Sequence, residues 1–118
     1  MVWPASAQQP DDASWTGFRN GEARTGRASG PGPDRPARAW TFTLDGVGYA
    51  SAAVDEEGTV YTGSSGSLYA IDSNGQRKWS VPSDGYAISS PSLGNGSVYF
   101  GSSDHSLYAI DTASGSIE

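Results

Sequence analysis

One segment of this chain is written almost identically a second time. Residues 60–72 read VYTGSSGSLYAID, and residues 98–111 read VYFGSSDHSLYAID. The match continues upstream at a constant spacing, with Trp40 aligned on Trp79. The differences in length are single residues, and they fall in turns. The sequence therefore encodes two copies of one structural unit, and any fold proposed for the chain must accommodate both.

Each copy consists of short runs rich in Val, Ile, Tyr and Phe, separated by Gly, Asn, Asp and Ser, which is the pattern of strands and turns. No window shows sustained 3.6-residue apolar periodicity, so we expect essentially no helix. A further strand at residues 39–43 is the counterpart of residues 78–81 one period later. The strands predicted for the two copies are 49–54, 59–63, 67–71 and 77–81, then 89–93, 97–101 and 106–110, with a fourth beginning at residue 116.

One strand of each copy is apolar at every position, LYAI at residues 68–71 and again at 107–110. Such a strand is buried on both faces, whereas a two-sheet sandwich with one wet face predicts alternation. A period of about 40 residues with several short strands is typical of propeller blades, in which each sheet packs between two others. We therefore predict an all-β fold of four-stranded antiparallel β-propeller blades, with about two blades in this chain and hence an incomplete propeller.

The chain divides into three parts. Residues 1–14 are predicted to be a disordered tail or a signal-peptide remnant, because Ala5-Ser6-Ala7 has the small-x-small pattern of a cleavage site. Residues 15–37 are predicted to be a lead-in segment and connector that starts with a short strand or docking segment. The repeats occupy residues 38–118, with blade 1 at about 49–81 and a truncated blade 2 at about 88–118.

Repeat units bury their faces only against neighbours, and roughly three or more are needed for stability. We therefore expect this chain to be the N-terminal part of a larger propeller. The alternative is that several copies associate to close a ring.

Charge and composition exclude several classes of function. Residues 1–40 hold five Arg and four acidic residues, whereas residues 41–118 hold two basic and nine acidic residues. An acidic repeat region argues against nucleic acid as a partner, because phosphate contacts need clustered Lys and Arg. Cysteine is absent, so disulfides and thiolate metal sites are not available. No apolar run is long enough to cross a bilayer as a helix, so no membrane span is predicted.

The second copy ends in A-x-D-x-x-S-G, and the first copy contains the same pattern with a turn one residue shorter and a Trp four residues after the glycine. The residues concerned are Ala109, Asp111, Ser114 and Gly115, and before them Ala70, Asp72, Gly75 and Trp79. This pattern resembles the tryptophan-docking motif A-x-D-x-x-T-G-x-x-x-W of the PQQ-like (quinoprotein) β-propeller repeat family. The resemblance covers residues 38–118 well and residues 15–37 loosely.

The motif also has a physical rationale. An Asp at the end of a strand can accept hydrogen bonds from the N–H groups of its own turn, and Gly adopts the positive φ that other residues resist. A Trp can then bury on the order of 200 Å² against a neighbouring blade. We therefore predict a structural role for all nine motif residues, which are Trp40, Ala70, Asp72, Gly75, Trp79, Ala109, Asp111, Ser114 and Gly115.

No catalytic, cofactor-binding or metal site is predicted. His105 is the only histidine, lies in a hairpin turn and has no counterpart in the first copy, so no Ser/His/Asp grouping can be assembled around it. The acidic turn Asp55-Glu56-Glu57 lacks the alternating oxygen-ligand spacing of a calcium loop and is predicted to be an exposed polar turn.

The resemblance implies a non-catalytic protein-interaction scaffold similar to the outer-membrane assembly protein BamB, exported to the periplasm or cell surface. One alternative is a fragment of a PQQ-dependent dehydrogenase, although such enzymes bind PQQ with Ca²⁺ and often carry a vicinal cysteine pair that this sequence lacks. A second alternative is a sensor or ligand-binding propeller attached to another domain. We accordingly expect no enzyme activity, no cofactor, and as partners another protein and the remaining blades of a parent propeller.

Overall fold

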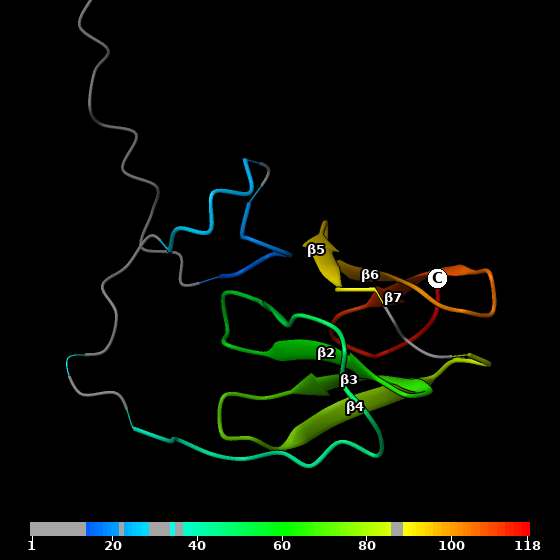
Figure 1. Cartoon of the computed structure of the whole chain (residues 1–118), viewed down its shortest axis with the longest axis horizontal. Coiled ribbons are helices and arrows are strands. Elements are labelled where there is room, and N and C mark those ends of the chain that lie inside the picture. The colour runs from blue at the N-terminus through cyan, green and yellow to red at the C-terminus, as the bar shows by residue number, and fades with distance from the viewer. Residues whose placement is uncertain (1–13, 22, 29–33, 35–36, 86–88) are drawn as a thin grey trace, which may run out of the picture.

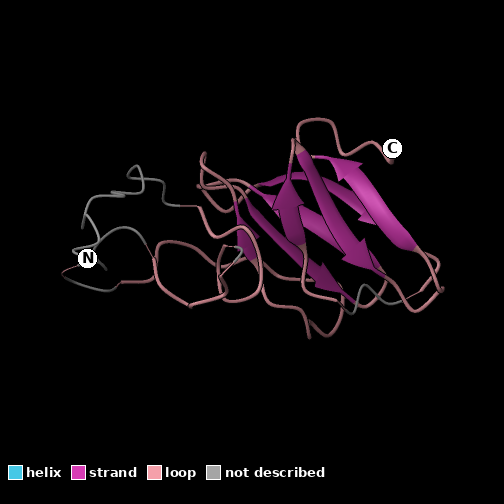
Figure 2. Cartoon of the chain, turned by 90° about the horizontal axis from the view of Figure 1, so that it is seen from above, coloured by secondary structure: helices cyan, strands magenta, loops and turns pink. Residues whose placement is uncertain are grey.

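The computed structural model describes residues 14–21, 23–28, 34, 37–85 and 89–118. The tail predicted for residues 1–14 falls outside this range except for Ser14, as do parts of the predicted connector. All regular elements among the described residues are strands, as Figure 2 shows. No helix that could cross a membrane is present in the described part. The strands are β1 (Ala53–Val54), β2 (Val60–Ser64), β3 (Ser67–Ile71), β4 (Arg77–Pro82), β5 (Ser92–Gly94), β6 (Ser97–Gly101) and β7 (Leu107–Asp111).

The strands form two antiparallel sheets in which each strand pairs with the next along the chain. The first sheet has the order β1-β2-β3-β4, and the second has the order β5-β6-β7. A single bridge between Ile110 and Ile117 continues the second sheet past β7. Figure 1 shows the two sheets one above the other. The predicted all-β fold with a repeated antiparallel sheet is therefore confirmed.

The two copies of the repeated segment form equivalent hairpins. In the first, β2 and β3 pair from Val60–Ile71 to Ser64–Ser67, and the turn contains Gly66 with φ of 97°. In the second, β6 and β7 pair from Ser97–Asp111 to Gly101–Leu107, and the longer turn contains His105 with φ of 72°. The extra residue is accommodated in the turn, and the pairing of the strands is unchanged.

Some strands are shorter than predicted. Only Ala53–Val54 of the predicted strand 49–54 pairs in the sheet, and Ser51 donates its N–H to the Ser90 hydroxyl (3.1 Å) instead of to a strand. The predicted strand 39–43 does not form backbone pairs with any strand among the described residues. This segment runs along the first sheet, on the side away from the second sheet, as Figure 1 shows. Its Phe42 ring meets Tyr69 edge-on at 5.7 Å.

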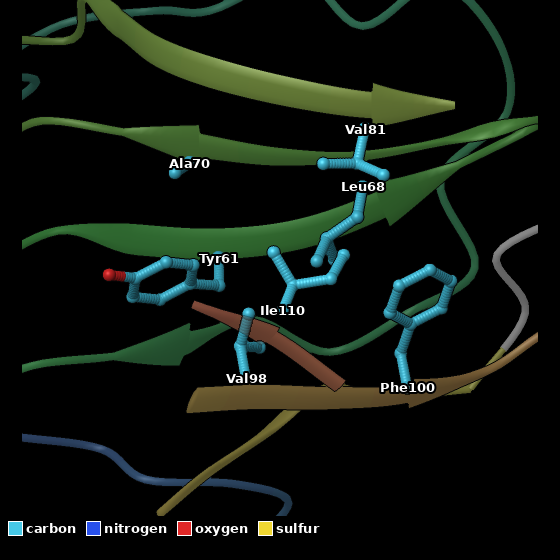
Figure 3. Packing of buried hydrophobic residues seen from close by; sticks show 7 residues of the cluster. All are labelled: Tyr61, Leu68, Ala70, Val81, Val98, Phe100 and Ile110. Carbon is cyan, nitrogen blue, oxygen red and sulfur yellow. The ribbon is translucent and has the colours of Figure 1, made fainter. Parts of the chain in front are cut away.

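The core lies between the two sheets and receives side chains from both. Each of these side chains is at most 6% exposed, so neither sheet could bury its inner face alone. Figure 3 shows the two sets of side chains directed toward each other. They are Tyr61, Leu68, Ala70 and Val81 from the first sheet, and Val98, Phe100 and Ile110 from the second.

The prediction that both LYAI strands are buried on both faces holds for one of them. In β3 all four residues of the motif are at most 4% exposed. In β7, Ile110 is buried but Leu107 is 77% exposed. The prediction is wrong for β7, because no described segment covers the face of the second sheet that carries Leu107.

Candidate functional site

Two tryptophans one period apart dock on turns. Trp79 in β4 donates its indole Nε1–H to the Thr112 carbonyl (3.0 Å), and Trp40 donates in the same way to the Ser73 carbonyl (3.0 Å). Thr112 and Ser73 are themselves one period apart, so the contact is repeated together with the sequence. Because Trp79 belongs to the first sheet and Thr112 follows the last strand of the second, this contact joins the two sheets.

The aspartates of the motif hold the turns on which the tryptophans dock. Asp72 Oδ1 accepts hydrogen bonds from the N–H groups of Asn74 (2.9 Å) and Gln76 (2.8 Å). Asp111 Oδ1 accepts from the N–H (2.7 Å) and the hydroxyl (2.6 Å) of Ser114, and these bonds lower the pKa of Asp111. Both carboxylates are thus engaged within their own turns.

The two motif glycines are needed for two reasons, which are the backbone conformation of the turn and the close approach of a tryptophan ring. Gly75 and Gly115 have φ of 81° and 74°, a region that side chains disfavour. A Cβ on Gly75 would lie 2.7 Å from Cγ of Trp40, and one on Gly115 would lie 2.8 Å from Cγ of Trp79. Ala70 pairs with Trp79 across β3 and β4. These contacts support the structural role that we propose for the motif.

Tyrosine–aspartate pairs, which were not predicted from the sequence, form a second set of internal contacts. Tyr61 donates its hydroxyl to Asp55 Oδ2 (2.8 Å), and Tyr108 donates to Asp104 Oδ2 (2.7 Å). Asp55 also accepts from the Thr59 N–H (2.7 Å). The bond from Tyr108 lowers the pKa of Asp104, and the Asp104 carboxylate raises the pKa of Tyr108. A further such bond is formed between Tyr69 and Asp45.

The hydrogen-bonded pair of Tyr61 and Asp55 can be tested by measuring stability and tyrosine ionisation at alkaline pH. Burial, reinforced by the bond to Asp55, raises the Tyr61 pKa far above its usual value of 10.0. Because the folded state favours the neutral phenol, this stabilisation is complete below pH 10 and is lost as pH rises toward the folded-state pKa. The free energy of unfolding should therefore fall as pH rises above about 10. Titration of tyrosinate absorbance should lose its latest step in Tyr61→Phe, and an unchanged titration would contradict this assignment.

A cavity of about 360 Å³ opens between the β1–β2 turn and the β5–β6 turn. It is acidic on the side of the first sheet, where Asp55, Glu56 and Glu57 line it. Both Asp55 oxygens are already hydrogen-bonded, whereas the two glutamates are exposed. No group of three or more potential metal ligands occurs in the described part of the chain. His105 is exposed in its turn, away from this cavity.

A short N-terminal segment, Trp15–Gly17, lies across the edges of both sheets. Trp15 and Val54 exchange two backbone hydrogen bonds of 2.7 Å each, and the Leu93 N–H donates to the Thr16 carbonyl (2.7 Å). We call this segment the strap. It covers the free edges of β1 and β5, and Figure 1 shows it beside β5. The short strand or docking segment predicted at residue 15 thus forms one bridge in the structure.

Replacing Trp15 by proline should release the strap. The substitution removes the N–H that bonds to Val54 and leaves that carbonyl unpaired, which costs about 1–3 kcal/mol. We expect amide hydrogen exchange at Val54 and Leu93 to become at least about tenfold faster. The control is Phe18→Ala, at a side chain that is 53% exposed. Unchanged exchange at both amides in Trp15→Pro would show that the strap is not bound there.

Two antiparallel sheets that repeat with the period of the sequence, stack face to face and are joined by a docked tryptophan define a pair of β-propeller blades. The family profile described as "Outer membrane protein assembly factor BamB", a PQQ-like repeat family, matches residues 25–118, and the chain belongs to this family. A search of curated protein sequences finds no match. The family includes non-enzymatic scaffolds and quinoprotein enzymes. The strap, at residues 15–17, lies before the residues that the family profile matches.

The residues of the acidic cavity do not fit the quinone that gives the family its name. PQQ carries three carboxylates, and the cavity presents the exposed carboxylates of Glu56 and Glu57 beside the hydrogen-bonded carboxylate of Asp55. Like charges at close range are unfavourable, and the described lining residues include no lysine or arginine to offset them.

Proposed function

We propose that this chain is part of a non-catalytic protein-interaction scaffold of the BamB type, acting in the periplasm or at the cell surface. The family match supports this, because the name of the family refers to outer-membrane protein assembly. The observation that carries the proposal is that several aspartate side chains are used inside the protein whereas several large apolar side chains face the solvent. The aspartates of four turns accept hydrogen bonds from their own turns, while several large apolar side chains are exposed.

Two of the exposed apolar side chains lie in the loop before β1, which packs closely on the first hairpin. Val47 is 56% exposed and Tyr49 is 80% exposed. The backbone beside them is close to the first hairpin, since a Cβ on Gly46 would lie 2.7 Å from Cβ of Ser65. Exposed aromatic side chains on a held backbone are typical of the residues that dominate protein–protein contacts. We propose Val47 and Tyr49 as contact residues for the partner.

Site-directed photo-crosslinking in cells tests this contact. A photoreactive residue at position 47 is expected to give a discrete crosslinked product, and the additional substitution Tyr49→Asp should abolish it. A photoreactive residue at position 74, on the exposed Asp72 turn, is the control and should give none. Equal products from both positions, or a product that survives Tyr49→Asp, would contradict the contact.

The alternative that the chain is a fragment of a PQQ-dependent dehydrogenase is tested separately. We expect calorimetric titration with PQQ and Ca²⁺ to show no binding. Binding in the micromolar range would overturn the scaffold proposal and favour the enzyme. The third alternative, a sensor propeller joined to another domain, has no observation in this structure that favours it over a scaffold.

A further inference from the structure

The strap binds both sheets through its backbone. Trp15 exchanges two hydrogen bonds with Val54 at the free edge of β1, and the Thr16 carbonyl accepts one from the Leu93 N–H at the free edge of β5. Each of these three bonds is 2.7 Å long. An extended peptide that adds to the edge of a sheet is held by backbone bonds of the same kind. The strap therefore shows what the two edges bind, which is an extended segment.

Two positions of the strap differ in the side chain that the sheets accept. Gly17 has to be small, because a Cβ on it would lie 3.3 Å from the Ser92 hydroxyl oxygen. Trp15, two residues earlier, is half-buried, whereas Phe18 is 53% exposed. Side chains two apart in an extended segment lie on the same face. The edges thus accept a segment with an aromatic residue followed two positions later by a glycine.

The strap also forms the wall between two cavities. Thr16 lines the acidic cavity of about 360 Å³ and, on its other side, a second cavity of about 290 Å³. Leu93, to which Thr16 is hydrogen-bonded, lines both cavities as well. Without the strap the two cavities would form one groove along the edges of β1 and β5. We call this space the edge groove.

One end of the edge groove is acidic. Glu56 and Glu57 line the first cavity together with Ser14 and are exposed. The strap itself supplies no cation there, since the residue at this position is a serine. A segment with Lys or Arg in place of Ser14 would bring a positive charge close to two carboxylates. The edge groove is therefore better matched in charge to such a segment than to the strap.

The loop that follows the strap is closed by its own hydrogen bonds. The Gly26 N–H donates to the Arg19 carbonyl (2.7 Å), and the Asn20 side-chain amide donates to the Arg27 carbonyl (3.1 Å). Among the described residues from 15 to 28, the hydrogen bonds to the two sheets are the three that the strap makes. The strap and its loop can therefore leave the edges together, and the loop need not be dismantled.

We propose that the edge groove binds an extended segment of a partner protein, with a basic residue, an aromatic residue and a glycine at the positions of Ser14, Trp15 and Gly17. The strap fills the edge groove until such a segment displaces it. Because the strap is tethered, its effective concentration at the edges is high, so it lowers the affinity for the partner and is autoinhibitory. The inference does not rest on the contact proposed for Val47 and Tyr49, which concerns a different part of the chain.

Fluorescence anisotropy with a labelled peptide of residues 14–21 tests the site in the full-length chain. Trp15→Pro in the chain releases the strap and should raise the affinity for the peptide at least about tenfold, because the tethered competitor is gone. Phe18→Ala in the chain is the control and should bind like the original chain. The same peptide carrying Trp15→Pro lacks an N–H that the edge needs and should not bind.

A second chain variant keeps this experiment decisive. Gly17→Val crowds the Ser92 hydroxyl and also releases the strap, so it replaces Trp15→Pro in the chain if that variant does not fold. The proposal is overturned if the original and released chains bind the peptide equally, or if neither binds it.

Amide hydrogen exchange of the released chain locates the peptide. The Val54 and Leu93 N–H groups lose their acceptors when the strap leaves, and saturating peptide should restore their slow exchange because its backbone supplies the same two carbonyls. Binding that leaves both amides in fast exchange would place the peptide elsewhere and would contradict the edge groove.

The charge of the occupant is tested with a peptide that carries Ser14→Arg. This peptide should bind the released chain more tightly than the original peptide, and the gain should disappear at high salt and in the double variant Glu56→Gln and Glu57→Gln. Both glutamates are exposed, so the double variant should fold normally. An Arg-containing peptide that binds no better, or a gain that survives the double variant, would contradict the basic residue proposed for the partner.

Discussion

Replacing Trp79 by alanine should lower the free energy of unfolding by about 3 kcal/mol, since removing a packed Trp costs roughly 3–5 kcal/mol and this ring is partly exposed. The ring packs against the core cluster, lies 5.7 Å from the ring of Tyr61, and donates to the Thr112 carbonyl of the second sheet. Its loss therefore weakens both the core of the first sheet and the contact between sheets. Small domains are stable by only about 5–15 kcal/mol, so the effect should be plain in urea denaturation.

The matched control for this substitution is Trp40→Ala. Trp40 makes the equivalent hydrogen bond to Ser73, but it lies on the outer side of the first sheet and is not among the residues packed against the core cluster. We expect it to cost clearly less than Trp79→Ala. Equal losses for the two substitutions would show that docking on the turn, and not contact between the sheets, determines the contribution of the tryptophan.

Replacing Gly115 by alanine should cost about 3 kcal/mol, whereas replacing Gly96 by alanine should cost about 1 kcal/mol. Both glycines have similar positive φ, 74° and 80°, so the backbone strain introduced by a Cβ is similar. They differ in their surroundings, because a Cβ on Gly115 would lie 2.8 Å from Cγ of Trp79 and a Cβ on Gly96 would meet nothing within 4 Å. The difference of about 2 kcal/mol is therefore the cost of displacing the docked ring.

The double variant tests this interpretation of the Gly115 result. Once Trp79 has been replaced by alanine, no ring remains to be displaced, so Gly115→Ala should cost about as little as Gly96→Ala. Free energies from urea denaturation of the single and double variants give this coupling directly. Additive effects of Trp79→Ala and Gly115→Ala would contradict a contact between the two residues.

Much of the fold could be predicted from the sequence because the repeat is local in character. The hairpins 59–63 with 67–71 and 97–101 with 106–110 were predicted within about one residue, since alternating turn and strand signals fix a hairpin over a short stretch. The aspartate and glycine of each motif were likewise readable, because a side chain that caps its own turn needs no distant partner.

The features that depend on distant segments were not predictable in the same way. The cavity requires the strap, the acidic turn and the β5–β6 turn to meet, and no spacing along the chain encodes that meeting. The exposure of Leu107 was missed because an apolar strand shows what could be buried, not whether a neighbour is present to bury it. The Tyr61–Asp55 pair spans one turn and could have been suspected from the spacing of the two residues, but hydrogen bonds between side chains leave no periodic signal.

The central claim is that the two repeats are adjacent blades joined by the docked ring of Trp79. The most direct measurement is the set of nuclear Overhauser contacts of the Trp79 indole in the cysteine-free chain labelled at tryptophan. We expect the ring protons to show contacts with the α-protons of Gly115, and the Nε1–H to exchange slowly because it is bonded to Thr112. Contacts of the Trp79 ring with residues of its own sheet alone, and none with residues 112–115, would contradict the account.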